Sequence, residues 1–279
     1  MFDNVVVGVD DSDAGRDALE LAKRLVFFDG NLLLVFVEVV MPAPSPDTDP
    51  QWQAADRRRA LERLASLRDE AQVDAQLLTV QAGSVASGLH EAVRRHGDLL
   101  VIGASRRDDF ERVFVGDDTR EVLDNAPSAV AVAPRGYAAR PPGLDTIGVA
   151  YNGSPASEEA LAVASELARE HNAELSAFEA VPEPIYVHDP RSGRWELEER
   201  LAKAYKRLDE LGDVKPRVAS GDAAQALARY AASVDLLVLG SHEHRPIDRF
   251  TGGSTSQRLA DNAPCPLLVL SAAGRDAGA

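Results

Sequence analysis

Residues suited to binding phosphate gather after an apolar run near the end of the sequence. From Gly240 to Pro266 the chain reads GSHEHRPIDRFTGGSTSQRLADNAPCP, so a glycine ends the run and GGSTS begins a helical pattern. Backbone N–H groups at a helix start attract phosphate oxygens, glycine lets them approach, and hydroxyl groups add donors. This chemistry predicts a phosphate site at Gly240, Gly252, Gly253, Ser254, Thr255 and Ser256. The alternative is a serine that only caps the helix.

The apolar run before Gly240 belongs to a pattern that occurs twice in the chain. GDLLVIG at Gly97–Gly103 returns as VDLLVLG at Val234–Gly240, and DNAP at Asp124–Pro127 returns at Asp261–Pro264. Self-similarity of this kind indicates one domain written twice. We predict a first domain at residues 1–135 and a second at 144–273, with a linker at Pro134–Asp145.

Within each repeat, short β-branched runs alternate with stretches whose apolar residues recur every three or four positions. This alternation is typical of βαβ units around a parallel sheet, so we expect an α/β fold with two tandem open parallel five-stranded sheets and helices on both faces. The strands are expected at Val5–Val9, Leu32–Val39, Ala75–Val80, Leu99–Gly103 and Ala129–Ala133, and at Thr146–Tyr151, Glu174–Ala180, Pro216–Val218, Leu236–Gly240 and Pro266–Leu270. The helices of the first half are expected at Ala14–Phe28, Ala54–Ala71, Ser84–Arg95 and Thr119–Asp124, with N-caps at Ser84, Ser157 and Asp222.

The loops after the first and fourth strands of each half should form the ligand site. Ligands of open α/β sheets bind beyond the carboxyl ends of the strands, where the strand order reverses, and these two loops emerge on that rim. The candidate residues in these loops are Asp10, Ser12 and Gly103 in the first half, and Asn152, Gly153, Ser154 and Gly240 in the second.

With these residues the chain resembles the universal stress protein family, tandem type, over essentially its whole length. Nucleotide-binding members carry a glycine, two residues, a glycine, nine residues, a glycine and then serine or threonine. Gly240, Gly253 and Ser254 match this motif, and Glu243 replaces its second glycine. The resemblance implies an adenine nucleotide alpha-hydrolase-like, Rossmann-like fold that binds ATP at the rim. It places the phosphates at Gly240, Ser241, Gly253, Ser254 and Ser256.

The first half departs further from the phosphate motif. It keeps Gly103 and Gly116, but Arg106 stands in place of the second glycine and Asp117 in place of the hydroxyl residue. A carboxylate at a helix start already complements the helix dipole, so a triphosphate would meet a negative charge there.

At the nucleoside end the difference is reversed. The resemblance implies an Asp at the end of the first strand that contacts the nucleoside, followed by Gly-Ser. The first half keeps Asp10 and Ser12, whereas the second has Asn152, Gly153 and Ser154, in which an amide replaces the carboxylate and can still hydrogen-bond. We therefore expect ATP binding in the second half.

The resulting hypothesis is a stress-response protein that binds ATP, with or without Mg²⁺, in its second domain and acts as a non-catalytic sensor or regulator. We expect no catalytic residue and, at most, slow ATP hydrolysis. One alternative is an interaction scaffold without nucleotide, built as an internal dimer through Ala129–Ala133 and Pro266–Leu270, the strands by which the family pairs. The other is an ATP-cleaving enzyme. Its PP-loop type needs Ser-Gly-Gly-x-Asp-Ser after the first strand, where this chain has DDSDAG and NGSPAS, and no Gly-Lys pair supplies a Walker P-loop.

Charge and composition limit the kinds of partner that the chain is expected to bind. The formal net charge is -15, from 45 acidic and 30 basic residues, so nucleic acid is not expected as a partner. The sequence shows no apolar run long enough to span a membrane and no signal run, which predicts a cytoplasmic protein. No metal is expected at His242, Glu243 and His244, and Cys265 should be a core side chain. An unknown protein partner and a further homodimer remain open.

Overall fold

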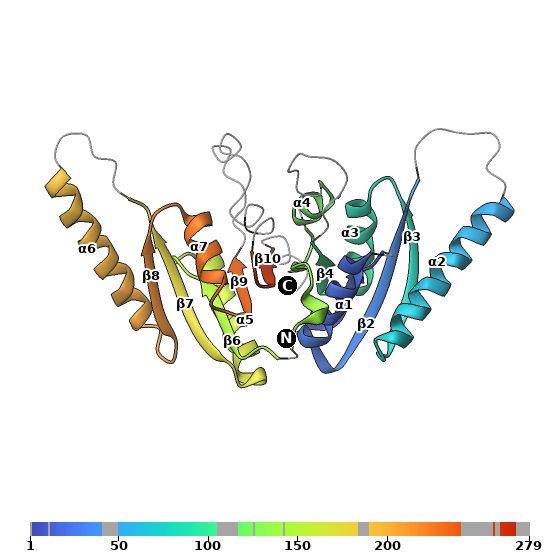
Figure 1. Ribbon diagram of the computed structural model, residues 1–279, viewed down its shortest axis with the longest axis horizontal. Coiled ribbons are helices and arrows are strands. Elements are labelled where there is room, and N and C mark those ends of the chain that lie inside the picture. Colours follow the sequence, from blue (N-terminus) through green and yellow to red (C-terminus); the bar gives the residue numbers. More distant parts are fainter. Residues whose placement is uncertain are drawn as a thin grey trace. The chain divides into compact units, whose positions relative to one another are not determined.

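The computed structural model describes residues 2–10, 12–40, 50–104, 117–124, 126–141, 143–183, 190–240, 259 and 263–271. The chain divides into two compact units, one reaching to Pro141 and the other running from Pro142 to Ala272. Each unit is α/β, with parallel strands flanked by helices (Figure 1), which confirms the predicted fold class.

In the first unit the described strands follow the order β3-β2-β1-β4-β5. All their pairings are parallel, so each connection crosses over through a helix. The elements are β1 (Phe2–Gly8), α1 (Asp13–Leu25), β2 (Val26–Val39), α2 (Pro50–Glu70), β3 (Ala75–Ala82), α3 (Val85–His96), β4 (Leu99–Gly103), α4 (Asp117–Leu123) and β5 (Ala129–Ala133), with a 3-10 turn at Tyr137–Ala139.

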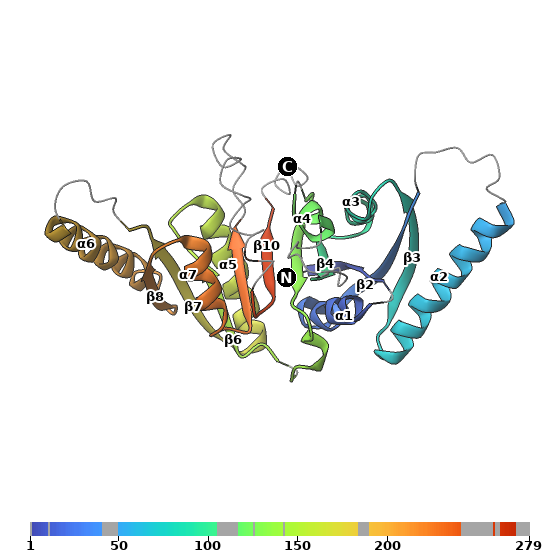
Figure 2. The same cartoon turned by 45° about the horizontal axis from the view of Figure 1, so that its top comes forward.

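The second unit repeats this plan, with described strands in the order β10-β9-β6-β7-β8 and parallel pairings. Its elements are β6 (Thr146–Ala150), α5 (Pro155–His171), β7 (Glu174–Val181), α6 (Pro190–Asp209), β8 (Lys215–Ser220), α7 (Ala223–Ala231), β9 (Leu236–Gly240) and β10 (Leu267–Leu270). In each unit a long helix flanks a strand at one end of this order, α2 beside β3 and α6 beside β8 (Figure 2).

Two local predictions were wrong. The first helix ends at Leu25, and Val26–Phe28 open β2, because valine and two phenylalanines favour a pleated strand and Val26 pairs with Phe2. Ser154, not Ser157, caps α5, since Pro155 occupies the first helical position that proline favours. The N-caps predicted at Ser84 and Asp222 are confirmed.

Apolar strands form the core of each unit. In β4, Leu99–Ile102 are buried, as are Leu236–Leu239 in β9, so both faces of these central strands are covered by helices. Cys265 is also buried, as predicted for a core side chain. In the part of the chain that the structure describes, no helix has the length and hydropathy needed to cross a bilayer.

Candidate ligand sites at the carboxyl edges of the sheets

The loop after β1 forms a tight polar turn. One carboxylate oxygen of Asp10 accepts hydrogen bonds from the Ser12 backbone N–H, at 3.0 Å, and from the Ser12 hydroxyl. The Ser12 hydroxyl oxygen accepts in turn from the Ala14 N–H and caps α1. The predicted pair Asp10 and Ser12 therefore lies at the start of a helix, on the rim where it was expected.

Gly103 ends β4 directly against the start of α1. A Cβ atom at Gly103 would lie 2.1 Å from the Ala14 carbonyl oxygen, and one at Gly15 would lie 2.8 Å from the Asp10 carbonyl oxygen. No side chain fits at either distance, so Gly103 lets the end of β4 approach the start of α1, and Gly15 lets the turn after β1 close tightly. The structure thus brings Asp10, Ser12 and Gly103 together.

A cavity of about 120 Å³ opens at this meeting point. It is bordered by the carboxyl ends of β1, β2 and β4 and by residues of α1, α3 and α4. Asp10 and Gly103 both line it, and most other lining side chains are aliphatic, among them Val37, Leu89 and Val122. The position at the reversal of strand order matches the general location of ligand sites in open α/β sheets.

A second cavity, of about 180 Å³, lies between α1 and α2 beside the same loop. Its polar lining includes Arg16 of α1 and Arg63 and Glu70 of α2, and Phe36 of β2 forms part of its apolar wall. None of these helical residues was singled out from the sequence, because ligand contacts were expected only in the loops that follow the strands. The repeated run Arg-Leu-x-x-Leu, at Arg63 and again at Arg207, was the signal that could have found them.

In the second unit Asn152 builds the same turn that Asp10 builds in the first. The Asn152 side-chain oxygen accepts the Ser154 N–H at 3.1 Å, and the Ser154 hydroxyl oxygen accepts the Ser157 N–H at the start of α5. Gly153 has φ +77°, a conformation that glycine adopts without strain. Asp and Asn thus share one acceptor role and differ in the remaining atom, an oxygen in Asp10 and an NH₂ donor in Asn152.

Gly240 holds the position that Gly103 has in the first unit. A Cβ atom there would lie 2.2 Å from the Ala156 carbonyl oxygen, so β9 ends in contact with the first turn of α5. The contact brings the loops that begin at Asn152 and Gly240 to one edge, as the rim argument predicted.

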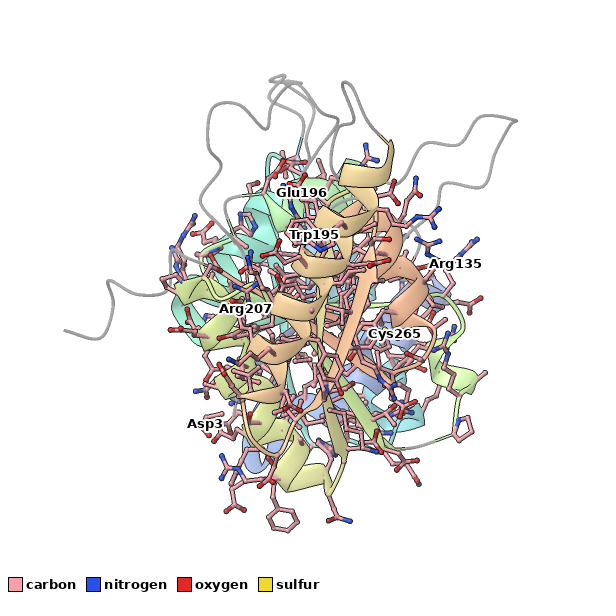
Figure 3. The ribbon with its side chains drawn as sticks, turned by 90° about the vertical axis from the view of Figure 1, so that its left-hand side faces the viewer. Asp3, Arg135, Trp195, Glu196, Arg207 and Cys265 are labelled. Atoms are coloured by element: carbon pink, nitrogen blue, oxygen red, sulfur yellow. The ribbon has the colours of Figure 1, made fainter. Side chains whose placement is uncertain are left out.

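Beside this edge a buried carboxylate is paired with an arginine. Arg207 of α6 donates from Nη2 to Glu179 Oε1 at 2.7 Å and from Nε to Oε2 at 3.1 Å. The Glu179 side chain is 11% exposed and that of Arg207 45%. The stem of Arg207 passes the Asn152 turn, since its Cδ lies 3.5 Å from where a Cβ of Gly153 would stand. Figure 3 shows Arg207 on α6, toward the opposite end of the helix from Trp195.

The other predicted phosphate residues fall in parts of the chain that the structure does not describe. These are Gly116, Ser241, Gly252, Gly253, Ser254, Thr255 and Ser256, and the segment with His242, Glu243 and His244 shares that status. Their roles remain predictions.

Comparison with known proteins agrees with this architecture. The model of the Universal stress protein family matches residues 1–134 and again 143–271. Universal stress protein Rv2005c of Mycobacterium tuberculosis is 29% identical over 289 residues, covering 95% of this chain and 96% of that protein. The crystal structure of a universal stress protein from Archaeoglobus fulgidus aligns with a TM-score of 0.70 at 17% identity, covering 96% of this chain and 98% of that one, and so shows the same fold. The double match of the family model shows that the chain belongs to the universal stress protein family, with the family domain present twice.

Proposed function

We propose that this chain binds ATP in its second unit and acts in the cytoplasm as a sensor or regulator without turnover. The observation that carries the proposal is the contact of Gly240 with the first turn of α5. This contact brings the end of β9 to the edge where Asn152 forms its turn, and in the sequence Gly253 and Ser254 follow β9. A nucleotide could then meet amide and hydroxyl groups at both of its ends.

The electrostatics favour the second unit over the first for the phosphates. The sequence offers Gly253 and Ser254 in the second unit, where the first has Gly116 and Asp117. A hydroxyl can donate to a phosphate oxygen, whereas a carboxylate repels it. The scaffold alternative draws support from the Glu179–Arg207 pair, which fills space between α6 and β7 with protein groups rather than ligand.

Calorimetry on the full-length chain with ATP and Mg²⁺ tests the proposal. The unmodified chain should release binding heat, and Ser254→Asp should abolish it, because this change installs the carboxylate that the first unit already has. Asp10→Asn, in the first unit, is the matched control and should leave the heat unchanged. Absence of ATP binding by the unmodified chain would favour the scaffold, and consumption of ATP over hours would favour the enzyme.

A further inference from the structure

The cavity between α1 and α2 in the first unit takes no part in the proposed ATP site. Its volume is about 180 Å³, and its charged lining consists of Asp10, Arg16 of α1, and Arg63 and Glu70 of α2. Pockets that enclose a whole drug-sized ligand measure roughly 300–1,000 Å³. The space therefore suits a molecule smaller than a drug-sized ligand.

Three of the four charged residues at this cavity have partners close by. Nη2 of Arg16 lies 3.8 Å from Oε2 of Glu70, and Nη1 of Arg16 lies 3.3 Å from Oδ1 of Asp13. One carboxylate oxygen of Asp10 accepts hydrogen bonds from the backbone N–H and the hydroxyl of Ser12. The charges of Arg16 and Glu70 thus largely offset each other at one side of the cavity.

The fourth charged residue, Arg63, shares the cavity with an apolar wall. Phe36 of β2 and Leu64 and Leu67 of α2 line the same space. A guanidinium carries five N–H donors in a planar fork, so it can hold a ligand carboxylate through two of them in addition to its contacts within the protein. The cavity therefore combines a fork that fits a carboxylate with apolar surface that fits a short tail.

The second unit shows an arginine at the equivalent helical position bound to a carboxylate. Arg63 of α2 and Arg207 of α6 both begin the run Arg-Leu-x-x-Leu, and the leucine that follows each of them is buried. Arg207 holds the Glu179 carboxylate through two hydrogen bonds, of 2.7 and 3.1 Å. This position on the helix is thus suited to bind a carboxylate beside the neighbouring strand.

In the first unit the strand supplies a phenylalanine at the position of that carboxylate. Gly8 pairs with Val35, and Ala150 pairs with Phe178, so the next residues along the two strands, Phe36 and Glu179, correspond. Phe36 and Arg63 line one cavity, which shows that the two positions face the same space in the first unit as well. A carboxylate at this place has to come from outside the strand.

We propose that the cavity between α1 and α2 binds a small organic carboxylate with an apolar tail. The carboxylate of the ligand meets Arg63 as the Glu179 carboxylate meets Arg207, and the tail packs against Phe36. The cavity lies in the first unit and the proposed ATP site in the second, so neither site depends on the other.

Fluorine NMR titration of the full-length chain with 4-fluorobenzoate, in the absence of nucleotide, tests the proposal. The probe should bind one site per chain with a dissociation constant on the order of 1 mM. Arg63→Met should weaken binding at least about tenfold, because it removes the fork and keeps an apolar stem. Arg59→Met is the matched control. Arg59 lies one turn earlier on α2, where it pairs with Asp56, and its loss should leave the affinity unchanged.

Two further measurements sharpen the test. The uncharged amide of the same ring, 4-fluorobenzamide, should bind at least about tenfold more weakly than 4-fluorobenzoate. Phe36→Glu places a carboxylate of the protein itself beside Arg63, as Glu179 stands beside Arg207, and should also weaken the probe at least about tenfold. Circular dichroism checks that this variant folds, and if it does not, Arg63→Met and the amide decide the outcome.

Three results would overturn the proposal: no binding of 4-fluorobenzoate, equal binding of the acid and the amide, or an affinity that Arg63→Met leaves unchanged. Failure of the unmodified chain to bind ATP would overturn only the proposed function, because the probe is titrated without nucleotide.

Discussion

The two units place different side chains at one equivalent point beside the ligand loop. Gly8 of β1 is paired with Val35 and Ala150 of β6 with Phe178, so the next residues along β2 and β7, Phe36 and Glu179, correspond. In the first unit Phe36 borders the cavity of about 180 Å³ between α1 and α2. In the second unit Glu179 is instead tied to α6 by two hydrogen bonds from Arg207.

The cores of the two units also differ, because a large side chain in the second unit fills the space left by smaller residues on its strands. Register makes Val6 and Leu33 of the first unit equivalent to Gly148 and Ser176 of the second. Tyr230 fills the space above Gly148, where a Cβ would lie 2.6 Å from the phenol oxygen, and it hydrogen-bonds Ser176. The difference teaches that the repeats kept one backbone plan while exchanging apolar contacts for polar ones in the second unit. We expect the following substitutions to test this comparison.

The largest effect is expected where both units are alike. Gly103→Ala and Gly240→Ala should each destabilise their own unit by about 3 kcal/mol or more, because the new Cβ meets a backbone oxygen that cannot move cheaply. Hydrogen exchange read by mass spectrometry assigns the loss to one unit. Gly83→Ala, whose Cβ would meet no atom within 4 Å, is the control and should change exchange little.

A smaller loss of stability is expected when the ion pair between Arg207 and Glu179 is broken. The first unit has Phe36 in place of Glu179. Arg207→Met should lower the free energy of unfolding by about 2–3 kcal/mol, since Glu179 is left without its partner and partial exposure of Arg207 screens the charge. Urea unfolding followed by circular dichroism measures it. Lys203→Met removes an exposed pair with Glu199 on the same helix and should cost no more than about 0.5 kcal/mol. An equal decrease in the free energy of unfolding in the two variants would show that the Arg207–Glu179 pair stabilises the protein no more than an exposed pair does.

Of the test substitutions, as distinct from their controls, Tyr230→Phe should have the smallest effect at pH 8. It leaves the Ser176 hydroxyl short of a partner and should cost about 1–2 kcal/mol at pH 8. Burial raises the pKa of Tyr230 from 10.0 to about 12, against the lowering effect of the Ser176 hydrogen bond. Because the folded pKa is the higher one, the stability that the protonated phenol contributes is complete below pH 10 and is lost as pH rises toward 12.

Urea unfolding at several alkaline pH values checks this sign. Stability of the unmodified chain should fall across that window by up to about 1.4 kcal/mol per pH unit more steeply than that of Tyr230→Phe. Parallel pH profiles for the two chains would contradict the assignment of the alkaline loss to Tyr230.

Much of the fold could be predicted from the sequence, because fully buried parallel strands are continuous apolar runs and the runs occur twice. The prediction of Ala129–Ala133 as a strand coincides with β5. The prediction of the first helix failed at Val26–Phe28. There the helical spacing of apolar residues continues past Leu25, although these three residues favour a strand. Where the spacing of apolar residues indicates a helix and the residue types favour a strand, the sequence alone does not decide between them.

The candidate site was predictable where it depends on the strand ends. Asp10 and Asn152 follow their strands directly, so the rim rule locates them. The Glu179–Arg207 pair was not predictable, since it joins a strand to a helix that follows it in sequence, and only packing decides which arginine of that helix turns inward.

The central claim is that the first unit keeps the residues for the nucleoside end of ATP and the second unit keeps those for the phosphate end. The number of ATP molecules bound per chain tests it. Native mass spectrometry of the full-length chain with ATP and Mg²⁺ should show one ATP, still present in Asp10→Asn and absent in Ser254→Asp. Two ATP molecules per chain, or one that persists in Ser254→Asp, would contradict the account.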